Sequence, residues 1–208
     1  MTIEEGIQRV DEASQKMVEA NTLINDAIMN SFLFTWRWWL GIALFILPWI
    51  VWIIYRKRES TARFFLAGLS SIILGILIDK FAIALGIWSY PIKFIPNSGF
   101  TLLPFQYSML PVGVMFALQW KPNMNPFLKG ILMGGFSAYI VEPIFTQMRF
   151  YNPKNWLYTY DVFIYFTIFM VAYWISNMSA WGPIRSDNKA DRSLELTLHS
   201  LGRKQKAK

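Results

Sequence analysis

Residues 38–58 read WWLGIALFILPWIVWIIYRKR, an uncharged run followed directly by three consecutive basic residues. A helix needs about 20 apolar residues to cross the hydrocarbon core of a bilayer. The run from Trp38 to Tyr55 is close to that length. Lys and Arg gather in the cytoplasmic loops of membrane proteins. The stretch therefore predicts a transmembrane helix whose Tyr55 end faces the cytoplasm.

Further apolar stretches follow along the chain. Hydrophobic residues make up 54% and charged residues 16% of the sequence, whereas soluble domains carry about 25% charged residues. We expect an all-α, polytopic integral membrane protein with five transmembrane helices, its N-terminus outside and its C-terminus inside. The four later helices are predicted at about 64–88, 104–120 and 127–148, and between Asp161 and Arg185.

The basic residues are distributed unevenly between the two predicted sides. Thirteen of the 20 Lys and Arg fall on the predicted cytoplasmic side and six on the other side, and Lys80 lies within a span. This bias accounts for the net charge of +7 as an orientation signal. We therefore expect a multi-pass protein of the cell membrane that binds no nucleic acid.

The residue types that are missing exclude several kinds of chemistry. The chain has no cysteine and one histidine, His199, which lies in a polar segment near the C-terminus. Disulfides, thiolate metal sites and histidine metal clusters are therefore excluded. We expect no metal and no cofactor.

Two polar segments flank the predicted membrane domain at 36–181. Residues 1–35 are predicted to form an extracytoplasmic helix, because positions 3, 7, 10, 14, 17, 21, 24 and 28 follow heptad spacing and six of the eight are apolar. Residues 1–30 are predicted to mediate homo-oligomerisation or to dock a partner protein; alternatively, this helix lies on the bilayer. Residues 182–208 are predicted to form a basic cytoplasmic tail near anionic lipid.

Polar side chains fall at one predicted depth inside the spans. With a helix rise of about 1.5 Å per residue, Asp79, Gln106 and Glu142 lie roughly 20–24 Å from the basic residue that marks the inner end of each helix. This level is the outer third of the bilayer. Polar groups inside a membrane are functional candidates by default. The candidate binding residues are Asp79, Lys80, Gln106, Tyr107, Glu142, Arg149 and Asp161.

The same residues admit a structural and a functional interpretation. Lys80 and Glu142 are predicted to pair across two helices, because neighbouring residues such as Asp79 and Lys80 point about 100° apart. The cluster is then an ion-pair network that fixes helix order, or a pocket or proton path, or, if the span boundaries differ, a set of solvated residues. Prolines near this level predict opened helices, with residues 89–104 as a re-entrant cap or an ordinary loop.

Several motifs resemble known membrane proteins. Leu47-Pro48-Trp49, Gly86-Ile87-Trp88-Ser89-Tyr90-Pro91, Gln119-Trp120-Lys121-Pro122-Asn123 and Glu142-Pro143 together resemble an uncharacterised multi-spanning family of spore-forming Gram-positive bacteria. This resemblance covers residues 36 to 180. It implies a bacterial membrane location and a helical fold, and it implies no activity.

A second motif is similar to a stretch of lycopene-cyclase-domain membrane proteins. It runs from Asp79 through Ala82, Gly86 and Trp88 to Tyr90. In that family a Pro-x-Glu-Glu type motif follows, whose carboxylic acids protonate a polyene. The corresponding place here reads Pro104-Phe105-Gln106-Tyr107 and has no acid. The similarity therefore implies a shared architecture without the expected catalytic residues.

Three functions are consistent with these features. The first is a non-enzymatic ligand-binding, sensor or accessory protein with a polar pocket in the outer third of the bilayer and a lipid or isoprenoid as ligand. The second is a small proton-coupled transporter that uses Asp79, Lys80 and Glu142. The third is a membrane enzyme acting on an isoprenoid or lipid, with Glu142 as a protonated acid.

Overall fold

The computed structural model of the chain describes residues 1–96 and 101–178. Regular structure in these residues is entirely helical. Four helical segments are long and apolar enough to cross a membrane. They are α2 (Trp36–Tyr55), α3 (Thr61–Ala84) with the preceding turn η2 (Arg58–Ser60), the segment Pro126–Gln147, and α7 (Tyr158–Ser176).

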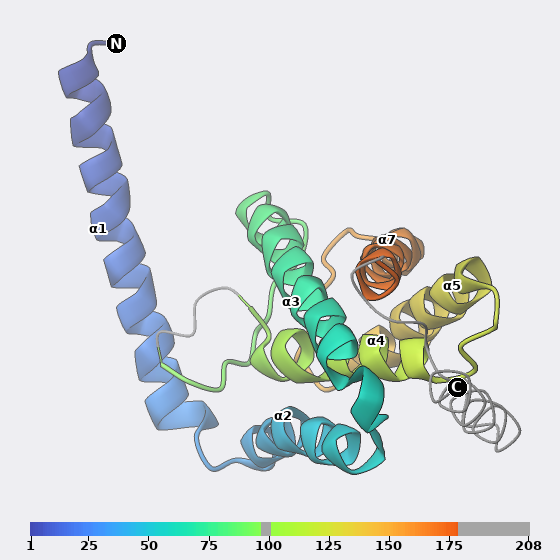
Figure 1. Cartoon of the computed structure of the whole chain (residues 1–208). Coiled ribbons are helices and arrows are strands. Elements are labelled where there is room, and N and C mark those ends of the chain that lie inside the picture. Colours follow the sequence, from blue (N-terminus) through green and yellow to red (C-terminus); the bar gives the residue numbers. More distant parts are fainter. Residues whose placement is uncertain (97–100, 179–208) are drawn as a thin grey trace, which may run out of the picture.

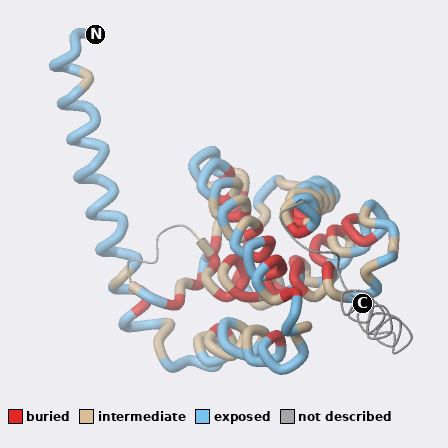
Figure 2. Tube along the Cα trace, in the orientation of Figure 1, coloured by how far each residue is buried: buried red, intermediate tan, exposed pale blue. Residues whose placement is uncertain are grey.

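A fifth, shorter helix lies between these four segments (Figure 1). It is helical over residues 103–119 and comprises the π-helical turn η3 (Phe105–Met109) and α4 (Leu110–Gln119). Most of α4 is buried, including Val114 and Met115, neither of which has any exposed surface. Buried residues concentrate along α3 and α4, whereas α2 is mostly exposed (Figure 2). The short helix is therefore the centre of the bundle.

The segment Pro126–Gln147 changes its helical geometry partway along. It begins as α5 (Pro126–Phe136), passes through the π-helical turn η4 (Ser137–Val141) and ends as α6 (Glu142–Gln147). π-Helical turns inside α-helices are rare and are frequent at functional sites. One such turn contains Gln106 and the other immediately precedes Glu142.

Proline explains one contact between the central helix and α2. Pro111 has no N–H to donate to the Tyr107 carbonyl, which is four residues earlier in the helix. That carbonyl instead accepts a hydrogen bond from the Trp49 indole Nε1 at 3.0 Å. The bond connects α2 to the centre of the bundle.

Glycines allow α5 and α7 to approach closely. A Cβ at Gly134 would lie 2.6 Å from the Val162 carbonyl oxygen, and one at Gly130 would lie 2.8 Å from the Phe166 ring. Gly130 and Gly134 are spaced four residues apart, a small-residue spacing that lets two helices pack closely.

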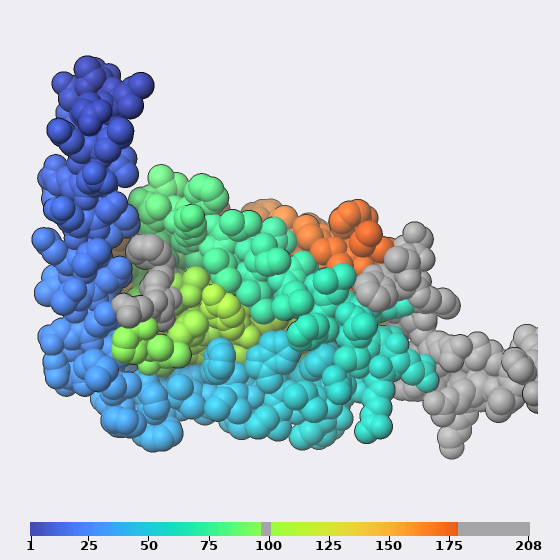
Figure 3. Space-filling model, turned by 60° about the vertical axis from the view of Figure 1, so that its left-hand side comes forward, coloured from blue at the N-terminus to red at the C-terminus, as the bar shows by residue number. Residues whose placement is uncertain are grey.

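The N-terminal arm, α1 (Ile3–Ala27), extends away from the bundle at a steep angle to α2 (Figures 1 and 3). A capping box between Thr2 and Glu5 begins the helix. No residue of α1 is buried. Burial starts at Ile28, the first residue of the turn η1 (Ile28–Phe32). The predicted basic tail at 182–208 lies outside the described residues.

Candidate functional site

The Asp79 carboxylate of α3 accepts hydrogen bonds from three neutral donors. Its Oδ1 accepts from the Tyr90 hydroxyl at 2.7 Å and from Trp88 Nε1 at 3.2 Å, and its Oδ2 accepts from Gln106 Nε2 at 2.7 Å. Asp79 is only 2% exposed. Gly75, one turn before Asp79, makes room for the Gln106 side chain, because a Cβ there would lie 2.2 Å from Gln106 Oε1. The cluster thus joins α3, the following loop and η3.

A helix-ending turn directs the loop back over Asp79. Gly86 adopts a positive φ of 72°, and the Ile87 N–H donates to the Ala82 carbonyl at 2.8 Å. This is a Schellman arrangement, in which glycine supplies the left-handed conformation. The chain therefore reverses direction and returns Trp88 and Tyr90 to the Asp79 carboxylate.

Two further carboxyl groups lie on the neighbouring helices. The Tyr165 hydroxyl donates to Glu142 Oε1 at 2.7 Å, and Trp156 Nε1 donates to Asp161 Oδ2 at 3.0 Å. Glu142 Oε2 is buried and accepts from no neutral donor. The carboxyl groups of Glu142 and Asp161 lie close enough to interact with each other. They form an acidic pair, and neither carboxyl group forms an ion pair with a described lysine or arginine.

All three carboxyl groups line one small cavity, which we call the acid cavity. Its volume is about 20 Å³, which holds about one water molecule. Tyr90, Tyr151 and Tyr165 contribute to its wall. The cavity is too small for an organic ligand in the conformation described.

The loops that cover the acid cavity are aromatic and joined to each other. Ser89 and Asn152 exchange backbone hydrogen bonds of 2.9 and 3.0 Å. Burial raises the pKa values of Tyr90 and Tyr151 well above the usual phenol value, and the nearby carboxylates add to the shift. Burial also lowers the pKa of Lys93, an effect that the charge of Asp79 partly offsets. The phenols therefore remain neutral donors above the acid cavity.

The structure brings four of the seven predicted site residues together: Asp79, Gln106, Glu142 and Asp161 all line the acid cavity. Tyr107 is only partly buried and contributes its carbonyl to Trp49. Arg149 and Lys80 are exposed and do not line the cavity. The remaining wall residues were not predicted; Trp88 and Tyr90 could have been found, because the Trp-x-Tyr spacing directly follows the acidic helix.

The predicted ion pair between Lys80 and Glu142 is wrong. Neither residue forms an ion pair, and Lys80 is exposed whereas Glu142 is 6% exposed. The two residues were predicted at similar depth, but Lys80 is on an exposed face of α3, whereas the preceding residue Asp79 is buried. Depth alone does not determine which way a side chain points around a helix.

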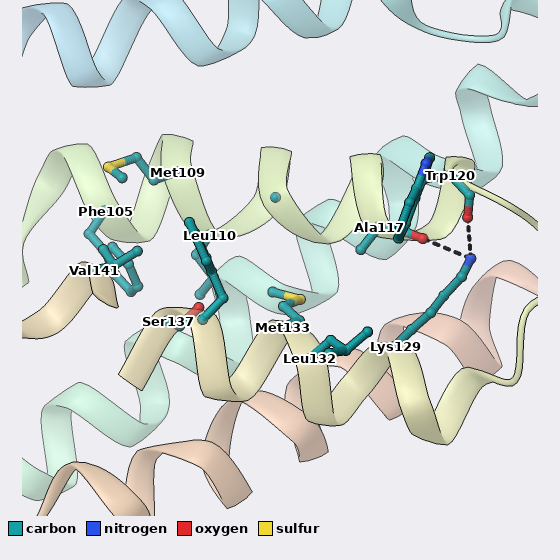
Figure 4. Close-up of a pocket in the computed structure, with 12 residues that line it drawn as sticks. Phe105, Met109, Leu110, Ala117, Trp120, Lys129, Leu132, Met133, Ser137 and Val141 are labelled. Carbon is teal, nitrogen blue, oxygen red and sulfur yellow. Dashed lines mark hydrogen bonds between the residues drawn. The ribbon is translucent and has the colours of Figure 1, made fainter. Parts of the chain in front are cut away.

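A larger, apolar groove runs between α4 and α5 (Figure 4). Its volume is about 340 Å³. Phe105 and Val141 lie at one end, and Trp120 and Lys129 lie at the other. The groove is lined by Phe105, Met109, Leu110, Gly113, Ala117, Trp120, Lys129, Leu132, Met133, Phe136, Ser137 and Val141.

Phe105 and Leu110 separate the groove from the acidic side chains. Leu110 lines both the groove and the acid cavity. Phe105 lines the groove and a second small cavity that includes Glu142 and Tyr165. Phe105 also packs edge-to-face against Phe145 and Tyr165 at 5.9 Å between ring centroids. One layer of apolar side chains thus lies between the groove and a buried acid.

No family model, no curated protein and no solved structure matches the chain.

Proposed function

We propose that this protein is a five-span protein of the cell membrane that binds a lipid chain in the groove between α4 and α5. The helix at 103–119 is about 26 Å long at 1.5 Å per residue, somewhat shorter than a hydrocarbon core of roughly 30 Å. Its position among four longer apolar helices supports a fifth crossing. In this proposal the end that carries Lys121 and Lys129 is cytoplasmic and α1 is outside.

The observation that carries the proposal is the groove itself. Ligand sites are concave, mostly apolar and roughly 300–1,000 Å³ in volume. The groove has about 340 Å³ and is lined almost entirely by apolar side chains. Its helices belong to the membrane-crossing bundle, so an isoprenoid or acyl chain is the ligand that the surrounding bilayer supplies. A non-enzymatic lipid-binding protein, acting as a sensor or accessory protein, needs no site besides this groove.

Two glycines provide a matched test of this function. A Cβ at Gly113 or at Gly135 would meet no atom within 4 Å, so a larger side chain is tolerated at either position. Only Gly113 lines the groove. Gly113→Phe should fill the groove and abolish lipid retention, whereas Gly135→Phe should leave it unchanged.

Retention is measured by purifying the full chain in mild detergent and identifying bound lipids by native mass spectrometry. A stoichiometric lipid in the wild type and in Gly135→Phe, and its absence from Gly113→Phe, is the expected result. The proposal fails if the wild type retains no lipid, or if both variants retain it equally.

A second candidate function is an enzyme that protonates an isoprenoid. It is favoured by Glu142, whose buried carboxyl group lies beside that of Asp161 and whose chain neighbour Val141 lines the groove. It ranks second because Phe105 and Leu110 block the path between groove and acid. Incubation with a polyisoprenoid in heavy water tests it: deuterium incorporated by the wild type and not by Glu142→Gln would support catalysis.

A further inference from the structure

The groove has one charged residue in its lining. Lys129 lies in the first turn of α5 and is 6% exposed. Its ammonium donates to the Ala117 carbonyl at 2.9 Å and also to the Trp120 carbonyl (Figure 4). Both carbonyls are at the C-terminus of α4, where a cation is favourable. Part of its role is therefore to hold α4 and α5 together at this end.

These two bonds do not satisfy the lysine completely. An ammonium carries three donor hydrogens, and two carbonyls account for two of them. Among the described residues no carboxylate forms an ion pair with Lys129. A buried cation without a counter-anion is unfavourable and gains strongly from an anionic partner.

The position of Lys129 matches the shape of an amphiphile. The residue is at the loop end of the groove, near the start of its helix, where lipid headgroups lie. The groove extends from it to Val141, about 18 Å along the helix. A charged head at Lys129 would therefore place an apolar chain along the groove toward Phe105.

We propose that the groove selects an acidic amphiphile, with a carboxylate or phosphate head on Lys129 and an apolar chain between α4 and α5. This inference rests on the proposed function, because it specifies the ligand of the same groove. The third N–H of Lys129 donates to the head, and the positive charge is neutralised. A neutral amphiphile of equal length fills the groove equally well but leaves the cation unpaired.

The test compares two probes that differ only at the head: palmitate and palmityl alcohol, each carrying a photoreactive diazirine in the chain. Both are titrated against the full-length protein in mild detergent, and crosslinked residues are mapped by mass spectrometry. The wild type should crosslink both probes within the groove. It should bind palmitate roughly tenfold or more tightly, as expected for a charge-assisted hydrogen bond.

Variants separate the contribution of the head from that of the chain. Lys129→Met keeps the length of the side chain and should reduce palmitate to the affinity of the alcohol. Lys129→Arg should keep the preference for the acid. Gly113→Phe should lose both probes, and Gly135→Phe should lose neither. Thermal melting identifies any variant that fails to fold.

The wild-type comparison decides the inference even if the lysine variants are unstable. Equal affinity for the two probes within the groove would overturn the acidic ligand and leave lipid binding intact. If neither probe crosslinks to the groove, the proposed function fails as well.

Discussion

Asp79 connects three parts of the chain through a single carboxylate. Its two oxygens accept from Trp88 and Tyr90 in the loop and from Gln106 in the central helix. All three partners donate to Asp79, which favours a group that can accept three hydrogen bonds. An ionised carboxylate is the side chain with that property.

Asp79→Asn should therefore destabilise the fold although it hardly changes the volume. The new amide would direct N–H groups at existing donors, and a buried donor left unsatisfied costs about 1–3 kcal/mol. The free energy of unfolding, measured by denaturant titration in detergent, should fall by that amount. Lys80→Gln is the control, because Lys80 is exposed one residue away. Equal losses in the two variants would contradict the assigned hydrogen bonds.

Glu142 should respond differently to removal of its charge. In Glu142→Gln the amide oxygen still accepts from Tyr165, and the new N–H₂ faces the carboxyl group of Asp161. Stability should remain unchanged or increase, because one of two adjacent acids is removed. The double-mutant cycle with Lys80→Met should be additive within about 0.5 kcal/mol. A substantial coupling energy would indicate an ion pair between Lys80 and Glu142, which the structure lacks.

Helix rise was enough to predict which polar residues share a level. Asp79, Gln106 and Glu142 were placed within a few ångströms of each other in depth, and all three line the acid cavity. Rotation about each helix was not predictable from depth, and Lys80 was therefore assigned to the wrong side. Tyr165 carried no signal, because it is one aromatic residue among many in an apolar helix.

At the level of elements, the ends of the helices could be predicted from the positions of charged residues and prolines. The first span was predicted to end at Tyr55 before three basic residues, and α2 ends there. Pro126 begins α5 one residue before the predicted start. The π-helical turns at Phe105–Met109 and Ser137–Val141 were not predicted. The nearby prolines indicated opened helices, but a π turn depends on tertiary packing.

Two adjacent glycines at the contact between α5 and α7 should respond differently to substitution by alanine. Gly134→Ala should destabilise the bundle by roughly 1–3 kcal/mol, because its Cβ would lie 2.6 Å from the Val162 backbone oxygen and one helix must move. Gly135→Ala meets no atom within 4 Å. It should be neutral or stabilising, since alanine favours the helix by up to about 1 kcal/mol. Equal melting temperatures would show that the helices are further apart.

The α1 arm should be removable without loss of the bundle. None of its residues is buried, whereas Ile28 is fully buried, so the deletion is residues 1–27. Thermal stability should be unchanged, while self-association through the exposed heptad face should weaken. A cysteine at Val10, on that face, should form intermolecular disulfides, and one at Glu19 on the polar face should not. An oligomer that survives the deletion would give the arm a different role.

At the scale of the whole molecule, the class of protein was predictable and the groove was not. Composition and apolar run lengths indicated an all-helical membrane protein, and four long apolar helices support it. The groove arises because the surrounding helices leave the Gly113 side of the central helix uncovered. No single stretch of sequence contains that information.

The proposed topology predicts which loops are accessible from outside the cell. The native chain has no cysteine, so each introduced cysteine reports a single position. Lys154→Cys and Lys93→Cys should react with an impermeant maleimide on intact cells. Lys121→Cys and Lys189→Cys should react only after the membrane is opened. The reverse pattern would show that the orientation is inverted. Reaction of both Lys121→Cys and Lys154→Cys on intact cells would show that residues 103–119 do not cross the membrane.

The burial of the short central helix has a consequence for biogenesis. A helix leaving the translocon is normally judged by its own apolar length, yet residues 103–119 gain most of their contacts from α2 and α3, which are made earlier. We expect this segment to insert inefficiently by itself and to depend on its neighbours for retention in the bilayer. A substitution that weakens α2 or α3 should then leave the central helix poorly held in the bilayer and expose it to the cell's membrane quality-control proteases.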